Sequence, residues 1–120
     1  MKNYLITIFG SQESEEAWSR MDPQEMQAHL KRYMDYSQRL RDEGRLVAAE
    51  GLSRNGAVLT KAAGKLEVTD GPYVFAKEMV GGFFYITAGS LAEAVSIAKD
   101  CPALETGGRV EVREQMDYGD

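Results

Sequence analysis

The chain has 120 residues, of which 43% are hydrophobic and 28% charged, and this composition suits one globular domain over residues 1–120. The net charge of −5 argues against a general nucleic-acid-binding protein, because such proteins need clustered Lys and Arg. No apolar stretch approaches the roughly 20 residues of a membrane span, no signal-peptide pattern is present, and the single Cys101 cannot form an internal disulfide. We therefore predict a cytoplasmic protein that binds neither nucleic acid nor membranes.

The first predicted element is a strand over Tyr4–Phe9. Both of its alternating sets of side chains are largely apolar, which is typical of a strand that is covered on both faces. The segment from Gly10 to Met21 is polar and acidic. It is predicted to be a loop, with room for one short helical turn around Trp18.

A strong helix-start pattern follows at Asp22, where the side chain can cap the helix and Pro23 suits the first helical position. Residues at helical spacing then continue to Gly44, which is predicted to end the helix in a left-handed conformation. They are Met26, Leu30, Tyr33, Met34, Ser37 and Leu40. We interpret the methionines as helix packing and not as a binding surface.

Strand and helix patterns alternate through the rest of the chain. The predicted elements are a strand at Leu46–Leu52, a hairpin of Ala57–Lys61 and Lys65–Thr69, a strand at Phe83–Ala88, a helix that begins at Ser90 and stops at Cys101-Pro102, and a last strand at Arg109–Glu114. This order predicts an α+β fold, a ferredoxin-like split βαβ with an inserted β-hairpin. Two helices cover only one sheet face, so we predict a homodimer whose sheets pack face to face.

The middle of the chain carries a turn-like triplet, a charged pair and a glycine pair: Asp70-Gly71-Pro72, Lys77-Glu78 and Gly81-Gly82. This pattern resembles the signature of the YCII-related, DGPF-type family of small bacterial proteins. The usual family core reads D-G-P-F-A-E-T-K-E, whereas here Tyr73 stands for the Phe and Val-Phe-Ala at 74–76 stands for Ala-Glu-Thr. The segments 42–46 and 107–113 resemble two further family motifs. The resemblance implies a dimeric α+β barrel.

The resemblance also implies two kinds of function. Some relatives resemble acid–base enzymes with a His–Asp pair, and the position of their His falls near Tyr33 in this chain. Family members also look like frequent genomic companions of extracytoplasmic-function sigma factors. An interaction or regulatory module with a sigma-factor-related partner is therefore the alternative to a small-molecule-binding protein or weak enzyme.

Three residues are candidate acid–base groups, namely His29, Asp42 and Asp70. His29 is the only histidine, and the ordinary alternative for it is a partly exposed helix residue. Asp42 is more typical of a helix end, and Asp70 can hold its turn by accepting backbone N–H groups. Cys101 follows a helix end, where the dipole raises the pKa of a thiol, and is interpreted as structural.

The candidate ligand-binding residues belong to the same middle segment: Asp70, Lys77, Glu78, Phe83 and Tyr85. Lys77 would anchor an anionic ligand while the aromatic rings pack against its apolar part. The ordinary alternative is a charged turn followed by a buried strand. No nucleotide-binding loop, C-x-x-C pair or histidine cluster is present, so we predict neither a cofactor nor a metal site. The predicted function is binding of a small anionic or aromatic molecule in a pocket at the dimer interface, with weak cofactor-free acid–base activity as an addition.

Overall fold

The computed structural model describes residues 1–71 and 78–119. Among these residues, four strands form a main sheet in the order β2-β5-β1-β6, and every neighbouring pair is antiparallel. Their bounds are β1 Lys2–Ser11, β2 Leu46–Gly51, β5 Glu78–Ala88 and β6 Arg109–Glu114. A separate hairpin consists of β3 (Gly56–Ala62) and β4 (Lys65–Gly71). This topology confirms the predicted α+β, ferredoxin-like split βαβ with an inserted hairpin.

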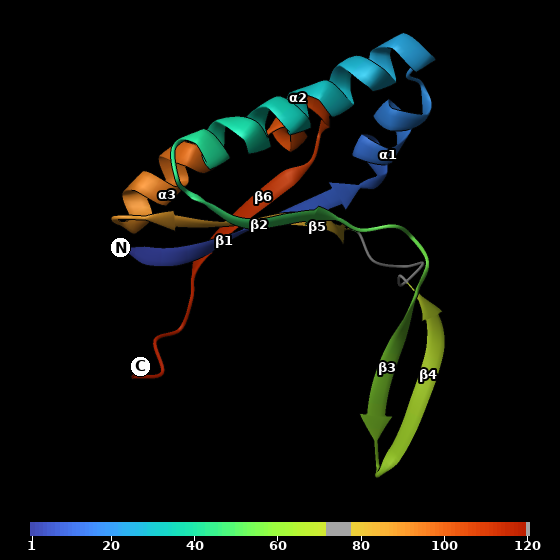
Figure 1. Cartoon of the computed structure of the whole chain (residues 1–120). Coiled ribbons are helices and arrows are strands. Elements are labelled where there is room, and N and C mark those ends of the chain that lie inside the picture. The colour runs from blue at the N-terminus through green and yellow to red at the C-terminus, as the bar shows by residue number, and fades with distance from the viewer. Residues whose placement is uncertain (72–77, 120) are drawn as a thin grey trace.

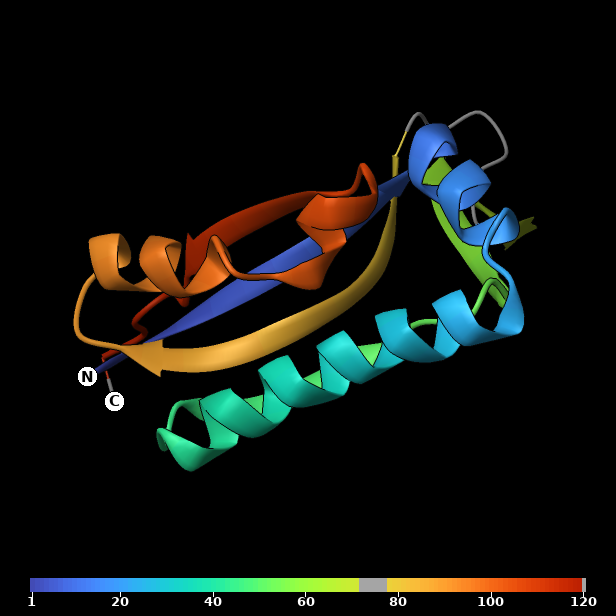
Figure 2. The ribbon, with the colours of Figure 1, turned by 90° about the horizontal axis from the view of Figure 1, so that it is seen from above.

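The helices cover one face of the main sheet, and the β3–β4 hairpin points away on the other side (Figure 1). The helical elements are α1 (Gln12–Ser19), α2 (Pro23–Asp42), α3 (Leu91–Ala98) and the short 3₁₀ helix η1 (Pro102–Thr106). Seen from above, α2 and α3 lie beside each other, and α1 lies where the hairpin leaves the sheet (Figure 2). The hairpin and the sheet face without helices therefore lie on the same side of the molecule.

The long helix α2 begins and ends where the sequence predicts. The Asp22 carboxylate accepts the backbone N–H of Glu25 at 2.8 Å, and Pro23 occupies the first helical position. Gly44 follows the helix at φ 72°, the left-handed conformation that glycine adopts without steric cost. These local signals define both ends of α2.

Of two further helical segments, the one around Trp18 is longer than the single turn allowed for there, and the 3₁₀ helix η1 was not predicted. The expected loop from Gly10 to Met21 contains α1, whose first turn is held by a reciprocal cap: the Ser11 hydroxyl accepts the Ser14 N–H, and the Ser14 hydroxyl accepts the Ser11 N–H. The usual capping box has Glu or Gln at the second position, and here serine takes that role. Pro102 does not only end α3 but also opens η1, because its fixed φ suits a first helical position.

The strands around the Asp-Gly-Pro triplet are longer than predicted. β4 includes Asp70 and Gly71, which lie opposite Ala57 and Gly56, although the triplet was expected to end the strand earlier. Pro72 lies outside the described residues. β5 begins five residues before Phe83 and contains the glycine pair.

One glycine of that pair has a clear packing role. A Cβ on Gly82 would lie 2.8 Å from the carbonyl oxygen of Glu50, so only glycine lets β2 and β5 approach this closely. Gly82 therefore serves the pairing of β2 with β5.

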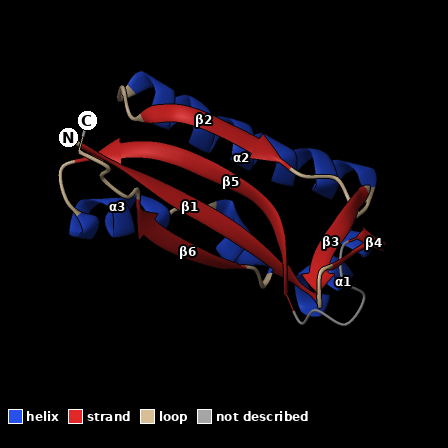
Figure 3. Ribbon diagram, turned by 90° about the horizontal axis from the view of Figure 1, so that it is seen from below, coloured by secondary structure: helices blue, strands red, loops and turns tan. Residues whose placement is uncertain are grey.

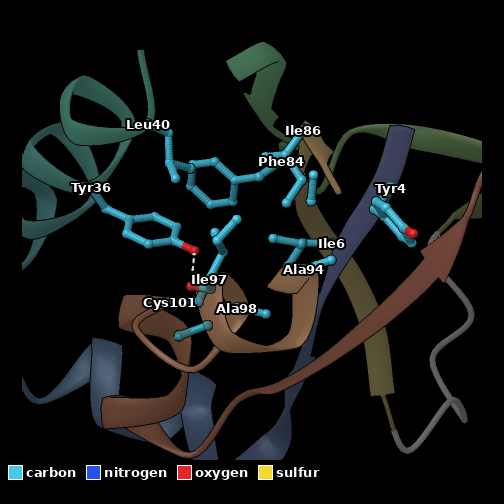
Figure 4. Close-up of a cluster of buried hydrophobic side chains, with 12 residues drawn as sticks. Tyr4, Ile6, Tyr36, Leu40, Phe84, Ile86, Ala94, Ile97, Ala98 and Cys101 are labelled. Carbon is cyan, nitrogen blue, oxygen red and sulfur yellow. Dashed lines mark hydrogen bonds between the residues drawn. The ribbon is translucent and has the colours of Figure 1, made fainter. Parts of the chain in front are cut away.

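The core lies between the helices and the sheet (Figure 4). Its members are Tyr4, Ile6, Tyr36, Leu40, Phe84, Ile86, Ala88, Ala94, Ile97, Ala98, Cys101 and Ala103. The Tyr36 hydroxyl donates a hydrogen bond of 2.7 Å to the Ile97 carbonyl, which ties α2 to α3 within the apolar layer. A buried polar group needs such a partner, because an unpaired hydroxyl would cost about 1–3 kcal/mol.

Both chain ends lie at the end of the sheet that is remote from the hairpin (Figure 1). Lys2 and Glu114 form an ion pair at 2.8 Å, and the Gln115 backbone N–H donates to the Asn3 carbonyl at 2.9 Å. The first and last strands are neighbours, so these contacts hold the ends together. No helix among residues 1–71 and 78–119 is long and apolar enough to cross a membrane.

Candidate functional site

A groove runs between α2 and the strands β5 and β2, and α1 borders it near the start of α2. Its volume is about 1390 Å³. Apolar side chains dominate its wall, and they come from both helices and from the sheet: Ile8, Phe9, Trp18, Met26, Leu30, Tyr33, Met34, Leu52, Met79, Val80, Phe83 and Phe84. A large apolar concavity with a few polar groups is the usual form of a small-molecule site.

The exposed part of α2 supplies one wall of this groove. Leu30 and Met34 lie on it, and their side chains are 46% and 70% exposed. Of the residues predicted at helical spacing in α2, only Leu40 is fully buried, and the other buried side chains of the helix are His29 and Tyr36. Interpreting Met34 as helix packing is therefore wrong, since this side chain faces the groove.

Charged groups stand at the groove wall as well. Arg54, in the segment between β2 and β3, forms an ion pair of 3.0 Å with Glu15 of α1. Arg41 and Glu50 also line the groove. Sequence reasoning did not select any of these residues, because nothing in the spacing of α1 and the 52–55 segment shows that they meet.

His29 is buried, with 3% of its surface exposed, and not partly exposed as its ordinary interpretation assumed. Its ring meets Trp18 and Tyr33 edge-on, with centroid distances of 4.6 and 5.2 Å. Its Nε2 atom has no hydrogen-bond partner among the described residues. Burial, and secondarily the charge of Arg32, lowers the pKa of His29 below its usual value of 6.5. The imidazole is therefore neutral at physiological pH.

Tyr33 connects this histidine with the groove. Its ring lies parallel to that of Phe84 at a centroid distance of 6.5 Å, and it lines the groove wall. Burial raises the pKa of the Tyr33 phenol, so the hydroxyl stays protonated and can donate a hydrogen bond. His29 is not part of the groove wall, but its ring contacts two residues that line the wall, Trp18 and Tyr33.

We expect the free energy of unfolding to fall when the pH is lowered from about 7.5 to about 5.5. The unfolded chain takes up a proton near pH 6.5, whereas folded His29 resists protonation, so the unfolded state binds more protons in this range. Urea unfolding at both pH values measures the loss, and His29→Phe should reduce the pH dependence. The carboxylates contribute equally to the pH dependence of the wild type and of His29→Phe, so the difference between the two proteins reports on His29.

Because His29 is the only histidine, its NMR titration provides an independent measurement. A folded-state pKa at or above 6.5 would contradict this expectation.

The remaining predicted site residues lie elsewhere. Asp70 is exposed near the base of the hairpin. Asp42 is exposed at the end of α2 and accepts a hydrogen bond of 2.8 Å from Gln38. Glu78 begins β5 opposite Ser11, and Lys77 lies outside the described residues. Cys101 is buried in the core, and this burial raises the pKa of its thiol, which fits a structural role.

Phe83 and Tyr85 alternate along β5 with the buried Phe84 and Ile86, so they point to the opposite sheet face. This is the face that carries no helix (Figure 3). In β1, Thr7 lies opposite Phe83 and Leu5 opposite Tyr85, and Leu5 is 38% exposed. Phe9 belongs to the same face, where it lies under the Arg109 guanidinium at 4.4 Å. Of the predicted ligand-binding residues that the structure describes, Phe83 alone reaches the groove wall.

No group of three or more His, Cys, Asp and Glu side chains within residues 1–71 and 78–119 is arranged to hold a metal ion. The groove instead offers aromatic faces, aliphatic side chains and hydrogen-bonding groups such as the Tyr33 hydroxyl. These groups can bind and orient an organic molecule.

Two comparisons with known proteins give the chain its context. A family model described as the YCII-related domain matches residues 3–117. An uncharacterized protein of Rhizobium meliloti (strain 1021) is 30% identical over an alignment of 115 residues, and the match covers 92% of this chain and 89% of the relative. Both matches extend over the sheet, the helices and the hairpin.

Proposed function

The chain belongs to the YCII-related domain family, and we propose that it binds a small aromatic or anionic molecule in the groove beside α2. The observation that carries this proposal is the groove itself, with its aromatic wall of Trp18, Tyr33 and Phe84. Aromatic faces favour a flat apolar ligand, and Arg41 and Arg54 supply cationic groups for an acidic substituent.

A homodimer is the second part of the proposal. The face of β1 and β5 with Leu5, Phe9, Phe83 and Tyr85 is too apolar to be an ordinary solvated sheet face, and the helices lie on the other side (Figure 3). A second copy packed on this face would bury these side chains. Phe83 contributes to the groove as well as to this face, so the ligand site would adjoin the dimer contact.

Binding does not require a reaction. The acid–base activity that the resemblance implies stays a prediction, because His29 does not line the groove and contacts it only through the rings of Trp18 and Tyr33. The alternative of an interaction module with a sigma-factor-related partner also stays a prediction.

We expect a member of a panel of aromatic carboxylates and phenols to raise the thermal unfolding midpoint and to change the emission of Trp18. A ligand that binds only the folded state stabilises it by mass action, and Trp18 is the single tryptophan and lines the groove. Leu30→Gln and Met34→Gln should each weaken binding about tenfold, since they remove apolar contact worth on the order of 1 kcal/mol.

The matched control is Lys31→Gln, on the same helix but outside the groove wall. Among the described residues Lys31 forms an exposed ion pair with Asp35, which contributes little to stability, so this variant should bind and unfold like the wild type. A panel without any response, or equal weakening by all three variants, would contradict the groove as the binding site and favour the interaction module.

A further inference from the structure

The β3–β4 hairpin has an apolar face that the described residues, 1–71 and 78–119, leave largely exposed. The register sets Leu59 opposite Val68 and Lys61 opposite Leu66, so the three apolar side chains share one face. Leu59, Leu66 and Val68 are 61%, 60% and 61% exposed. An isolated two-stranded hairpin is marginally stable in water, and this one is not hydrogen-bonded into the main sheet.

The chain also exposes more surface than a compact protein of its mass, and the hairpin is part of that surface. The total accessible surface is 8599 Å², whereas a compact protein of this mass exposes about 6450 Å². The radius of gyration is 16.3 Å, against about 13.6 Å for a compact domain of 120 residues. The hairpin contributes to this exposed area, since residues 59–70 are all exposed. A stable dimer needs about 800 Å² of contact from each partner.

We propose that the apolar face of this hairpin docks on a second copy of the same chain. The proposal rests on the face-to-face dimer inferred above. Each hairpin strand has seven residues and is about 24 Å long, whereas two stacked sheets lie about 10 Å apart. The hairpin projects from the side of the main sheet that carries no helix (Figure 1). If a partner's sheet packs on that side, the hairpin is long enough to extend beyond this second sheet. By two-fold symmetry the partner's hairpin does the same in return.

Charge supports a second copy as the occupant. Lys61 and Lys65 flank the turn at the hairpin tip, whereas the chain as a whole carries a net charge of −5. The tip is thus attracted to another copy of the chain. The base of the hairpin also matters for the ligand site, since Gly56 and Ala57 line the groove. A partner that holds the hairpin would fix this part of the groove wall.

The test is the molar mass of the full chain by sedimentation velocity over a range of concentrations. The wild type should have twice the 13.3 kDa of one chain. Leu59→Thr, Leu66→Thr and Val68→Thr combined should raise the dimer dissociation constant at least about tenfold, because threonine keeps the strand preference but removes apolar contact.

The control variant carries Val58→Thr and Thr60→Gln on the opposite face of the hairpin. It should dimerise like the wild type. A wild-type chain that is monomeric would overturn both this inference and the face-to-face dimer. A triple variant that dimerises normally, while a sheet-face variant does not, would overturn the docking of the hairpin alone.

A second measurement does not depend on the variants folding. Isotopically light and heavy wild-type chains are mixed and treated with an amine-to-carboxyl cross-linker. Cross-links from Lys61 or Lys65 that join a light to a heavy chain support the docked hairpin. Cross-links from these lysines only within one chain would contradict it.

Discussion

Replacing Phe84 with alanine is expected to lower the free energy of unfolding by about 3–5 kcal/mol. Phe84 is 4% exposed and packs edge-on against Tyr36 at a centroid distance of 5.0 Å, and it also lies parallel to Tyr33. Alanine would leave a cavity between α2 and the sheet that the rigid strands cannot close. Urea unfolding followed by circular dichroism measures the change.

The control is Val80→Ala on the same strand, where the side chain is 48% exposed and the expected loss is below about 1 kcal/mol. A loss below about 1 kcal/mol for Phe84→Ala would mean that the layer between α2 and the sheet is not the core of the fold.

Replacing the neighbouring Phe83 with aspartate is expected to have a different consequence, namely a monomeric chain of 13.3 kDa. Phe83 points to the open face, where it lies opposite Thr7 of β1 and Glu50 of β2. A carboxylate there would be desolvated between two sheets and would repel Glu50, so association should weaken by several kcal/mol, which is at least about a hundredfold. Light scattering measures the mass.

Val95→Asp is the matched control, since Val95 lies on α3 and is 39% exposed. It introduces the same charge on the helix side and should leave the mass unchanged. If Phe83→Asp keeps twice the mass of one chain with unchanged circular dichroism, the two copies do not meet through this face.

Phe83 and Phe84 illustrate how far the sequence determines the fold. Adjacent residues of a strand point to opposite faces, so the alternation of apolar side chains in β1 and β5 was enough to predict a sheet with two apolar faces. The caps at Asp22 and Gly44 predicted the limits of α2 in the same local way. Such signals depend on neighbours in the chain, and for this reason they can be read without a structure.

Weak local signals and contacts between distant segments account for the features that were missed. Helix α1 is short and held by the Ser11–Ser14 cap, a weaker signal than the usual Ser-x-x-Glu pattern. The groove needs Arg54, Trp18 and Met34 from three different segments, and no spacing within one segment reveals that they share a wall. α2 has 20 residues, and its apolar stripe packs on the sheet at one end and lines the groove at the other.

The candidate site was predicted around the Asp-Gly-Pro segment because its residue types suit a ligand. The structure places Asp70 on the exposed hairpin and Tyr85 on the open sheet face, while the groove lies beside α2. Residue type indicates what a side chain can bind, but only the pairing of β4 with β3 and of β5 with β1 determines where it points.

The position of the two chain ends has a practical consequence. Lys2 and Glu114 are in contact at one end of the sheet, and the hairpin and α1 lie at the other (Figures 1 and 2). An affinity tag, a fluorescent fusion partner or a surface attachment placed at either end would leave from the side remote from the hairpin. Immobilised chains would therefore keep the groove accessible to ligands in a flow cell.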